Sequence, residues 1–316
     1  MKNIARVRSA LKYLLLAAVL LIVVSLTWLR WESGLPKDDW FHERHGQIET
    51  VVSEPTVSQN GQLSESVRLE SDSGLEVSFR VVREVKTDAP LPVLLILGGH
   101  RTGSDAVDLF GEVSERAIVG VDYPYDGPEK VDGVIPIART IPLARQAILD
   151  IVPAVSLILD WLVEQAWVDK ERIVIVGASL GVPFAATAAA RDARITGVML
   201  VHGAVDTRLW LEVQVARRID TGLLHYPMST ILYWLAYGPV FDTGKYVADI
   251  SPRPVLIIGA RDDERTPAGQ AELLFNAAHE PKRLRLTEGQ HIQPNRDSII
   301  AELLRIADEE LPFLTQ

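Results

Sequence analysis

The sequence predicts an α/β protein with a mostly parallel central sheet, and two patterns carry that prediction. Five short, unbroken apolar runs alternate with longer stretches of helical composition: VLLIL, AIVGV, RIVIV, GVMLV and PVLII. Runs without alternation fit strands that helices cover on both faces of a parallel sheet. Residues 47–84 instead alternate apolar with polar residues and are broken by turn residues at 60–61 and 72–74. This alternation predicts antiparallel strands ahead of the parallel ones.

Length and composition favour one large domain after the amino-terminal segment. The chain has 316 residues, 47% of them hydrophobic, which is enough to bury a sizeable core. It has no cysteine, which excludes disulfides, thiolate metal sites and a cysteine nucleophile. Five of the 32 basic residues precede the first acid, so the remainder carries 27 basic against 42 acidic residues. Such a body would repel phosphate backbones, and we expect no nucleic-acid partner.

The amino terminus carries a candidate membrane anchor. Residues 13–29, YLLLAAVLLIVVSLTWL, are uncharged and follow four cations. At ~1.5 Å per helical residue, this run with its neighbours just crosses a ~30 Å hydrocarbon layer. A cleaved signal peptide, giving a secreted protein, is the alternative, although no small-x-small pair follows the run. We expect residues 1–31 to be a cytoplasmic tail and anchor, 32–46 a juxtamembrane linker, and 47–316 an extracytoplasmic domain, periplasmic in a bacterium.

A candidate nucleophile lies where the third apolar run meets an alanine-rich segment. There the sequence reads RIVIVGASLGVPFA, which places Ser179 between Gly177 and Gly181 at a predicted strand-to-helix turn. A serine in this G-x-S-x-G context is typical of the strained nucleophile elbow of serine hydrolases. The alternative is a tight turn that merely requires small residues.

A serine hydroxyl becomes a strong nucleophile only when a base takes its proton, so a histidine and a carboxylate are required. Both follow in the sequence. Asp262 and Asp263 come just after the fifth apolar run, in GARDDERTP, and His291 follows another short strand pattern, in RLRLTEGQH. Asp206, after the fourth run, is a weaker candidate acid.

Together, VDKERIVIVGASLG, GARDDERTP and EGQH resemble motifs of the α/β-hydrolase superfamily, especially its esterase, dienelactone-hydrolase-like and prolyl-oligopeptidase-like branches. The resemblance covers about residue 91 to the carboxyl end. It implies a triad of Ser179, Asp262 and His291, because the acid in the family commonly lies three residues after the last small residue of the strand, here Gly259. Counting back from Pro267 favours Asp263 instead, which remains the alternative acid.

The resemblance also implies an oxyanion hole of two backbone N–H groups. One comes from Leu180, the residue after the nucleophile. The other aligns with His100 in LLILGGHRTG, although glycine replaces the usual histidine of the family's His-Gly loop.

Three further features have two interpretations each. Residues 204–250 are rich in aromatic and aliphatic side chains and form either a helical lid over an acyl pocket or ordinary helix packing. His202 is either a satisfied buried histidine or part of the pocket lining. His42 and His45 are two residues of a hydrated linker rather than metal ligands, because no third ligand lies near them in the sequence.

These observations predict a membrane-anchored serine hydrolase that needs no cofactor and no metal. Its expected substrate is a small-molecule ester or acyl compound, cleaved through an acyl-enzyme by a carboxylesterase-like reaction. A peptidase of prolyl-oligopeptidase type is the enzymatic alternative, although no propeller is recognisable ahead of the catalytic segment. An inactive, membrane-tethered binding module is the alternative from another class.

Overall fold

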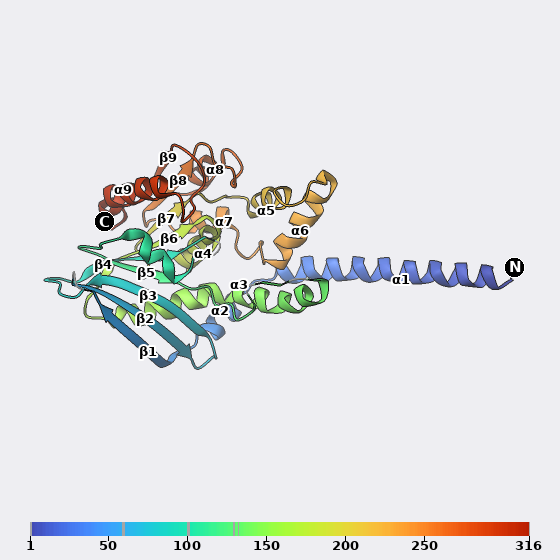
Figure 1. Cartoon of the computed structure of the whole chain (residues 1–316), viewed down its shortest axis with the longest axis horizontal. Helices are drawn as coiled ribbons and strands as arrows, with labels where there is room; N and C mark the ends of the chain where they lie inside the picture. Colours follow the sequence, from blue (N-terminus) through green and yellow to red (C-terminus); the bar gives the residue numbers. More distant parts are fainter. Residues whose placement is uncertain (1, 59–60, 100–101, 129, 132, 316) are drawn as a thin grey trace.

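The computed structural model describes residues 2–58, 61–99, 102–128, 130–131 and 133–315 (Figure 1). Within these residues the chain forms nine strands in a single sheet. Their bounds are β1 (Ile48–Val57), β2 (Gln62–Ser71), β3 (Glu76–Glu84), β4 (Leu91–Leu97), β5 (Ala117–Val121), β6 (Val168–Ala178), β7 (Gly197–Val201), β8 (Val255–Ala260) and β9 (Lys282–Thr287).

The sheet has the order β1-β2-β3-β5-β4-β6-β7-β8-β9. The first three strands form an antiparallel meander, and β3 joins β5 antiparallel. From β5 to β9 every neighbouring pair is parallel. Both predictions from the apolar patterns, the meander and the parallel strands, are therefore confirmed. Because the parallel strands share one direction, the loops that follow β4, β6, β7 and β8 meet at one edge of the sheet.

Helices cover both faces of the sheet. Their bounds are α1 (Lys2–Ser33), α2 (Asp38–His45), α3 (Val134–Val163), α4 (Val182–Arg191), α5 (Thr207–Ala216), α6 (His225–Leu235), α7 (Thr243–Asp249), α8 (Gln270–Ala277) and α9 (Asp297–Leu314), with 3-10 turns η1 (Ser104–Phe110), η2 (Ser179–Gly181) and η3 (Gly222–Leu224). Side chains of α3, α4, α7 and α8 share one buried cluster with the sheet. Side chains of η1 and α9 form a second cluster on the opposite face.

Helix α1 projects from the body as a long rod (Figure 1). Its segment Ala10–Ser33 has a mean hydropathy of 2.4, and none of its apolar 18-residue window is buried, so it is compatible with a membrane anchor or a signal sequence. Segment Ile135–Val163 of α3 is also long and apolar, but 72% of its apolar 18-residue window is buried. It is therefore the core helix of the body, and Pro142 and Pro153 both lie inside it.

The segment 32–46 is not the hydrated linker that we expected. Helix α2 lies within it and packs against the body through Phe41, which is buried beside Phe241. Arg44 donates hydrogen bonds to Asp150, and His45 hydrogen-bonds Asp160 at 2.7 Å. The segment is rich in charged residues, which led to the expectation of a solvated linker. These side chains instead pair with acids of α3, and the sequence does not reveal that α3 lies beside them.

Residues 204–250 lie outside the sheet as helices. Helices α5 and α6 pack on each other and stand away from the sheet (Figure 1). Helix α7 instead contributes the buried residues Tyr246 and Val247 to the core cluster beside α4. Only α5, η3 and α6 are thus placed where a lid would be.

Candidate active site

Ser179 lies on the sharp turn between β6 and α4. Its φ of +53° is in the left-handed region, which a residue with a side chain adopts at a cost of about 1–3 kcal/mol. The conformation lifts the hydroxyl out of the turn at the carboxyl edge of the sheet. Helix α4 begins three residues later, so its amino-terminal N–H groups and positive dipole end lie beside the serine.

The two glycines of G-x-S-x-G have physical reasons to be glycine. A Cβ on Gly177 would lie 2.6 Å from the Cβ of Ala185, and one on Gly181 would lie 2.1 Å from the carbonyl oxygen of Leu97. Both distances are far below ordinary contact distances. Strand β4 and helix α4 can therefore approach the backbone of the turn only because these two positions carry no side chain.

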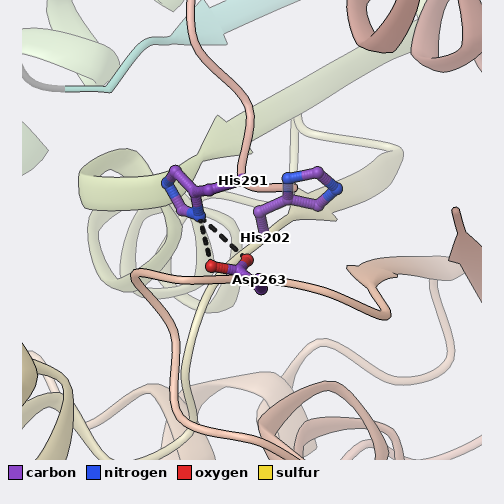
Figure 2. A group of neighbouring side chains, drawn as sticks. All are labelled: His202, Asp263 and His291. Atoms are coloured by element: carbon purple, nitrogen blue, oxygen red, sulfur yellow. Dashed lines mark hydrogen bonds and ion pairs between the residues drawn. The ribbon is translucent and has the colours of Figure 1, made fainter. Parts of the chain in front are cut away.

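His291 joins Ser179 to a carboxylate. Its Nε2 lies 2.7 Å from Ser179 Oγ, and its Nδ1 lies 2.9 and 3.0 Å from the two carboxylate oxygens of Asp263. Figure 2 shows the contact between His291 and Asp263. With the proton on Nδ1 donated to Asp263, Nε2 is free to accept the serine proton. This is the geometry that general-base activation of a serine requires.

The expectation that Asp262 approaches His291 is wrong, because the alternative residue, Asp263, occupies that position. Strand β8 continues one residue beyond Gly259, and the N–H of Asp262 donates to the carbonyl of Gly289, so Asp262 still runs alongside the loop after β9. Its side chain is exposed to solvent. The chain turns inward only after Asp262, which is why counting from Gly259 gave a position one residue too early.

Asp263 is held by its own loop. Its Oδ1 accepts hydrogen bonds of 2.8 Å from the N–H groups of Arg265 and Thr266. Burial alone would raise the pKa of Asp263, but the hydrogen bonds from His291 and from these two N–H groups outweigh it and lower the pKa below its ordinary value. The carboxylate is therefore charged at neutral pH and stabilises a positive charge on His291.

The next residue, Glu264, holds the backbone of His291. Its carboxylate accepts the N–H of His291 at 3.0 Å and pairs with Arg296 at 3.0 Å. Burial works against the charged form, yet these partners lower the pKa of Glu264 to about 2. The two adjacent acids thus fix the imidazole and the main chain of one histidine, a division that the sequence did not reveal.

His202 is buried beside His291, with ring centroids 5.6 Å apart (Figure 2). Its Nδ1 accepts the N–H of Ile292 at 2.8 Å, and its Nε2 lies 3.4 Å from Thr287 Oγ1. Burial, opposed by Asp263 and aided by the charge of His291, lowers the pKa of His202 to about 4. The residue is therefore a neutral, satisfied histidine that braces the loop of His291, as one of its two interpretations proposed.

His202, Asp263 and His291 also form a group whose potential metal-ligating atoms all lie within 4.8 Å of one another. Each already has a hydrogen-bond partner: Ile292 N–H for His202, His291 for Asp263, and Ser179 for His291. A metal held by Asp263 and by Nδ1 of His291 would have to displace the hydrogen bond between them. The donor set fits proton transfer better than metal binding.

Of the two expected oxyanion donors, only Leu180 belongs to the described residues, since His100 lies outside them. Leu180 lines the same cavity as Ser179 and His291. Gly99, the residue before His100, is close to the nucleophile: a Cβ there would lie 3.5 Å from the Cβ of Ser179. The loop after β4 therefore reaches the side of the serine from which a second donor would come.

Tyr123, which no sequence pattern singles out, supports that loop. Its hydroxyl donates to the carbonyl oxygen of Gly98 at 2.5 Å, and its ring packs against Phe184 of α4. A tyrosine two residues after an apolar run is a weak signal on its own. Asp206, the third candidate acid, instead caps α5 by accepting the N–H of Leu209 at 2.8 Å.

A cavity of about 750 Å³ opens at Ser179 and His291. One part of it is lined by Trp210, Gln214 and Arg218 on or just after α5, together with Arg265, and because Arg218 is exposed to solvent we take this part as the mouth. Its deeper part lies against the face of the sheet that η1 and α9 cover, and these lining residues are apolar: Leu94, Ile96, Ala106, Phe110, Val176, Met199, Val201, Ile300, Leu303 and Ala307. The site thus joins a polar reaction centre to an apolar chamber.

A profile described as the prolyl oligopeptidase family matches residues 151–295. This range contains Ser179, Asp263 and His291, but it spans less than half of the chain. No curated protein sequence matches the chain.

Several solved structures are similar to the chain at low identity. An acetyl xylan esterase from Paenibacillus sp. R4 has a TM-score of 0.57 and 17% identity, covering 82% of this chain and 89% of that one. Acetyl xylan esterase 1 from Thermoanaerobacterium sp. JW/SL YS485 has a TM-score of 0.57 and 16% identity, covering 88% and 96%. A cold-adapted esterase from an Arctic intertidal metagenomic library has a TM-score of 0.54 and 16% identity, covering 81% and 97%. At these identities the likeness concerns the fold.

Proposed function

The chain has the α/β-hydrolase fold, and from this premise we propose that it is a serine hydrolase that cleaves carboxylic esters through an acyl-enzyme. The observation that carries the proposal is the continuous contact from Ser179 Oγ through His291 to Asp263, with distances of 2.7 and 2.9 Å. The strained backbone of Ser179 and the neighbouring start of α4 support it further. Three esterases among the similar structures agree with it.

In the proposed cycle, His291 takes the hydroxyl proton of Ser179 while the serine oxygen attacks the ester carbonyl carbon. The resulting oxyanion accepts hydrogen bonds from the N–H of Leu180 and from the loop after β4 that contains His100. Asp263 keeps the imidazole in the right tautomer and stabilises its cation. His291 then gives the proton to the leaving alkoxide, and water releases the acyl group by the same route.

The cavity supports an ester with an apolar acyl part. The deeper part of the 750 Å³ cavity is lined by apolar side chains, so it accommodates hydrocarbon and would leave a polar chain unsolvated. At the mouth, the buried indole N–H of Trp210 has no hydrogen-bond partner among the described residues. An oxygen of a bound substrate would satisfy it.

The second candidate function is a peptidase, which the match to the prolyl oligopeptidase family favours. The same residues would act on an amide. The ester and amide reactions differ in the leaving group, because an amine must be protonated as it departs, whereas the phenolate of a p-nitrophenyl ester need not be. Substrate comparison therefore separates them.

We further propose that α1 anchors the chain in a membrane with its amino terminus in the cytoplasm. Four cations precede the apolar run, and basic residues near the end of a span tend to stay in the cytoplasm. The body with Ser179 would then lie on the other side. An active body that remains with the membrane fraction until detergent is added supports the anchor, whereas a soluble chain cut near residue 31 supports a signal peptide.

The hydrolase proposal is tested with the purified full-length chain in detergent. We expect hydrolysis of p-nitrophenyl esters of graded chain length, little cleavage of aminoacyl amides, and a loss of about 10⁴-fold or more in Ser179→Ala. Ser251→Ala, which removes a hydroxyl bonded to Glu280 far from the cavity lining, is the matched control and should retain full activity. Faster cleavage of the amides would favour the peptidase, and full activity in Ser179→Ala would refute the nucleophile.

A further inference from the structure

Helix α1 is fixed to the body rather than tethered to it by a flexible segment. Glu32 in its last turn pairs with Arg145 of α3 and accepts a 3.0 Å hydrogen bond from the hydroxyl of Tyr237, just after α6. Arg145 also donates to the carbonyl oxygens of Trp234 and Leu235, and its guanidinium lies 4.0 Å from the centre of the Tyr237 ring. One cluster therefore joins α1, α3 and α6, and the direction of α1 sets the orientation of the body.

The side of the body that faces along α1 is formed by α6 and the first turns of α3 (Figure 1). Helix α6 runs across α1 and contacts its last turns. These turns belong to the apolar segment Ala10–Ser33 and carry the exposed side chains of Trp28 and Trp31. Aromatic residues at such positions are typical of the boundary between hydrocarbon and headgroups. A bilayer crossed by α1 would end at the level of α6.

This side of the body exposes an apolar surface, which we call the α3–α6 rim. Its members are exposed aliphatic and aromatic side chains of η3, α6 and the start of α3: Ile135, Ile137, Leu223, Leu224 and Tyr226. Leu223 is 90% exposed and Ile135 is 67% exposed. Exposed apolar side chains that gather on one side of a body are typical of a surface that a protein or a membrane covers.

The charges near the rim differ from those of the rest of the body. Residues 221–241 contain no Asp, Glu, Lys or Arg, and residues 133–149 contain arginines but no acid. The exposed cations Arg139, Arg217 and Arg218 flank the apolar residues, and the exposed Asp220 is the one acid between residues 217 and 241. The chain beyond its first 31 residues carries a large excess of acids, so this basic and apolar combination is local. It fits an interface of hydrocarbon beneath anionic headgroups.

We propose that the α3–α6 rim lies in the surface of the lipid bilayer that α1 crosses. The bilayer is the one occupant that is continuous with α1 and that matches both the apolar side chains and the flanking cations. Because α5 packs on α6 and lines the mouth of the cavity through Trp210 and Leu211, the mouth then lies beside the lipid surface. This part of the proposal rests on the proposed function: in this position, an apolar ester can pass from the bilayer into the chamber.

The test uses the absence of cysteine, which makes any introduced cysteine a unique labelling site. The full-length chain carries a nitrobenzoxadiazole label on Leu223→Cys, Ile137→Cys, Val19→Cys or Val57→Cys, in vesicles of phosphatidylcholine and phosphatidylglycerol. Val19 lies in α1, and Val57 is a matched control, apolar and 59% exposed at the far edge strand β1. Quenching is measured with lipids that carry a doxyl group near the headgroup or deep in the acyl chain.

We expect the shallow quencher to quench labels at 223 and 137 at least twofold more than the label at 57. We expect the deep quencher to quench the label at 19 more than the label at 57. Quenching at 19 without quenching at 223 would overturn the rim. Absence of quenching at 19 by the deep quencher would also overturn the proposal for the rim, because that proposal requires α1 to cross the bilayer. Quenching between labelled copies at 223, without quenching by lipid, would assign the surface to a second chain and would also overturn it.

A second measurement separates the rim from the hydrolase proposal. The double variant Leu223→Glu with Leu224→Glu should hydrolyse a long-chain ester held in vesicles several-fold more slowly, with an unchanged rate on a water-soluble short ester. The pair Val51→Glu with Val57→Glu on β1 is the control and should alter neither rate. Equal rates of the rim variant and wild type on the vesicle ester would overturn the rim. If wild type hydrolysed neither ester, the proposed function would fail, while the quenching result would still stand.

Discussion

The two faces of the sheet are built differently. On one face, α3, α4, α7 and α8 pack against the sheet in a filled core, and Leu157, Ile158 and Leu162 of α3 are fully buried there. On the other face, the short turn η1 and helix α9 provide the cover, and the apolar part of the cavity of about 750 Å³ lies between them and the sheet. The comparison indicates that one face provides stability, while the thin cover of the other leaves space beside Ser179.

If the two faces differ in this way, substitutions that border the cavity beside Ser179 should alter the reaction rate, and substitutions in the filled face should alter the free energy of unfolding. After the nucleophile itself, the largest effect on rate should come from the carboxylate that orients His291. We expect Asp263→Asn to lower kcat by about 10²–10⁴-fold, because an amide supports the wrong tautomer and no longer stabilises the imidazolium. Asp262→Asn, whose side chain is exposed, should stay within about threefold of wild type. Kinetics on a p-nitrophenyl ester measure both, and a larger loss in Asp262→Asn would reverse the assignment.

The most direct contrast between the faces pairs two buried leucines. Leu157→Ala should lower the free energy of unfolding by about 3 kcal/mol with kcat unchanged, because it opens a void in a filled core. Leu303→Ala should cost about 1 kcal/mol, since its side chain already borders a cavity, and should raise the relative rate on longer acyl chains. Denaturant unfolding in detergent and a chain-length series measure these quantities. Equal stability losses with unchanged chain-length preference would remove the distinction between the faces.

His202 lies at the carboxyl edge, where the faces meet, and should affect stability through pH. Its pKa of about 4 in the folded chain lies below the ordinary value of 6.5, so the unfolded chain binds more protons between these values. Its contribution is complete above pH 6.5 and is lost as the pH falls toward 4, by about 2 kcal/mol at pH 5. Asp263 and Glu264, whose pKa values are lowered, contribute losses only at lower pH.

The measurement is denaturant unfolding of wild type and His202→Gln at intervals from pH 7 to pH 5. Wild type should lose stability across this range more steeply than the variant. Parallel pH curves would show that His202 titrates alike in both states and would contradict its burial as a neutral group.

The smallest effect should come from Tyr123, which acts through the backbone rather than on the substrate. Tyr123→Phe removes the hydrogen bond to Gly98 and should lower kcat about 3- to 10-fold with little change in KM, because the loop after β4 loses one restraint. Stability should change by less than about 1.5 kcal/mol. A raised KM with unchanged kcat would mean that the tyrosine supports substrate binding instead.

Much of this molecule could be predicted from local patterns. The meander and all five apolar strand runs follow from periodicity, and the elbow follows from two glycines whose Cβ atoms would collide with Ala185 and Leu97. These features depend on residues close together in the sequence. The choice of Asp263 over Asp262 depended on where β8 ends and on its hydrogen bonds to the loop after β9, which no local pattern contains.

The same limit applies to other residues that act at a distance. Segment 32–46 reads as polar and solvated, but Arg44 and His45 meet Asp150 and Asp160, more than a hundred residues away. Tyr123 and Glu264 support the site through backbone atoms of Gly98 and His291, and side-chain chemistry alone does not reveal such partners. Sequence patterns thus identified the reacting groups better than the groups that hold them.

The central claim, that Ser179 is an activated nucleophile, is tested most directly by a fluorophosphonate probe followed by mass spectrometry of the digested full-length chain. We predict one adduct, on the peptide that contains Ser179, formed rapidly in wild type and Asp262→Asn, slowly in Asp263→Asn, and not at all in Ser179→Ala. A folded wild-type chain that stays unlabelled, or that carries the adduct on another residue while Ser179 is unmodified, would contradict the account.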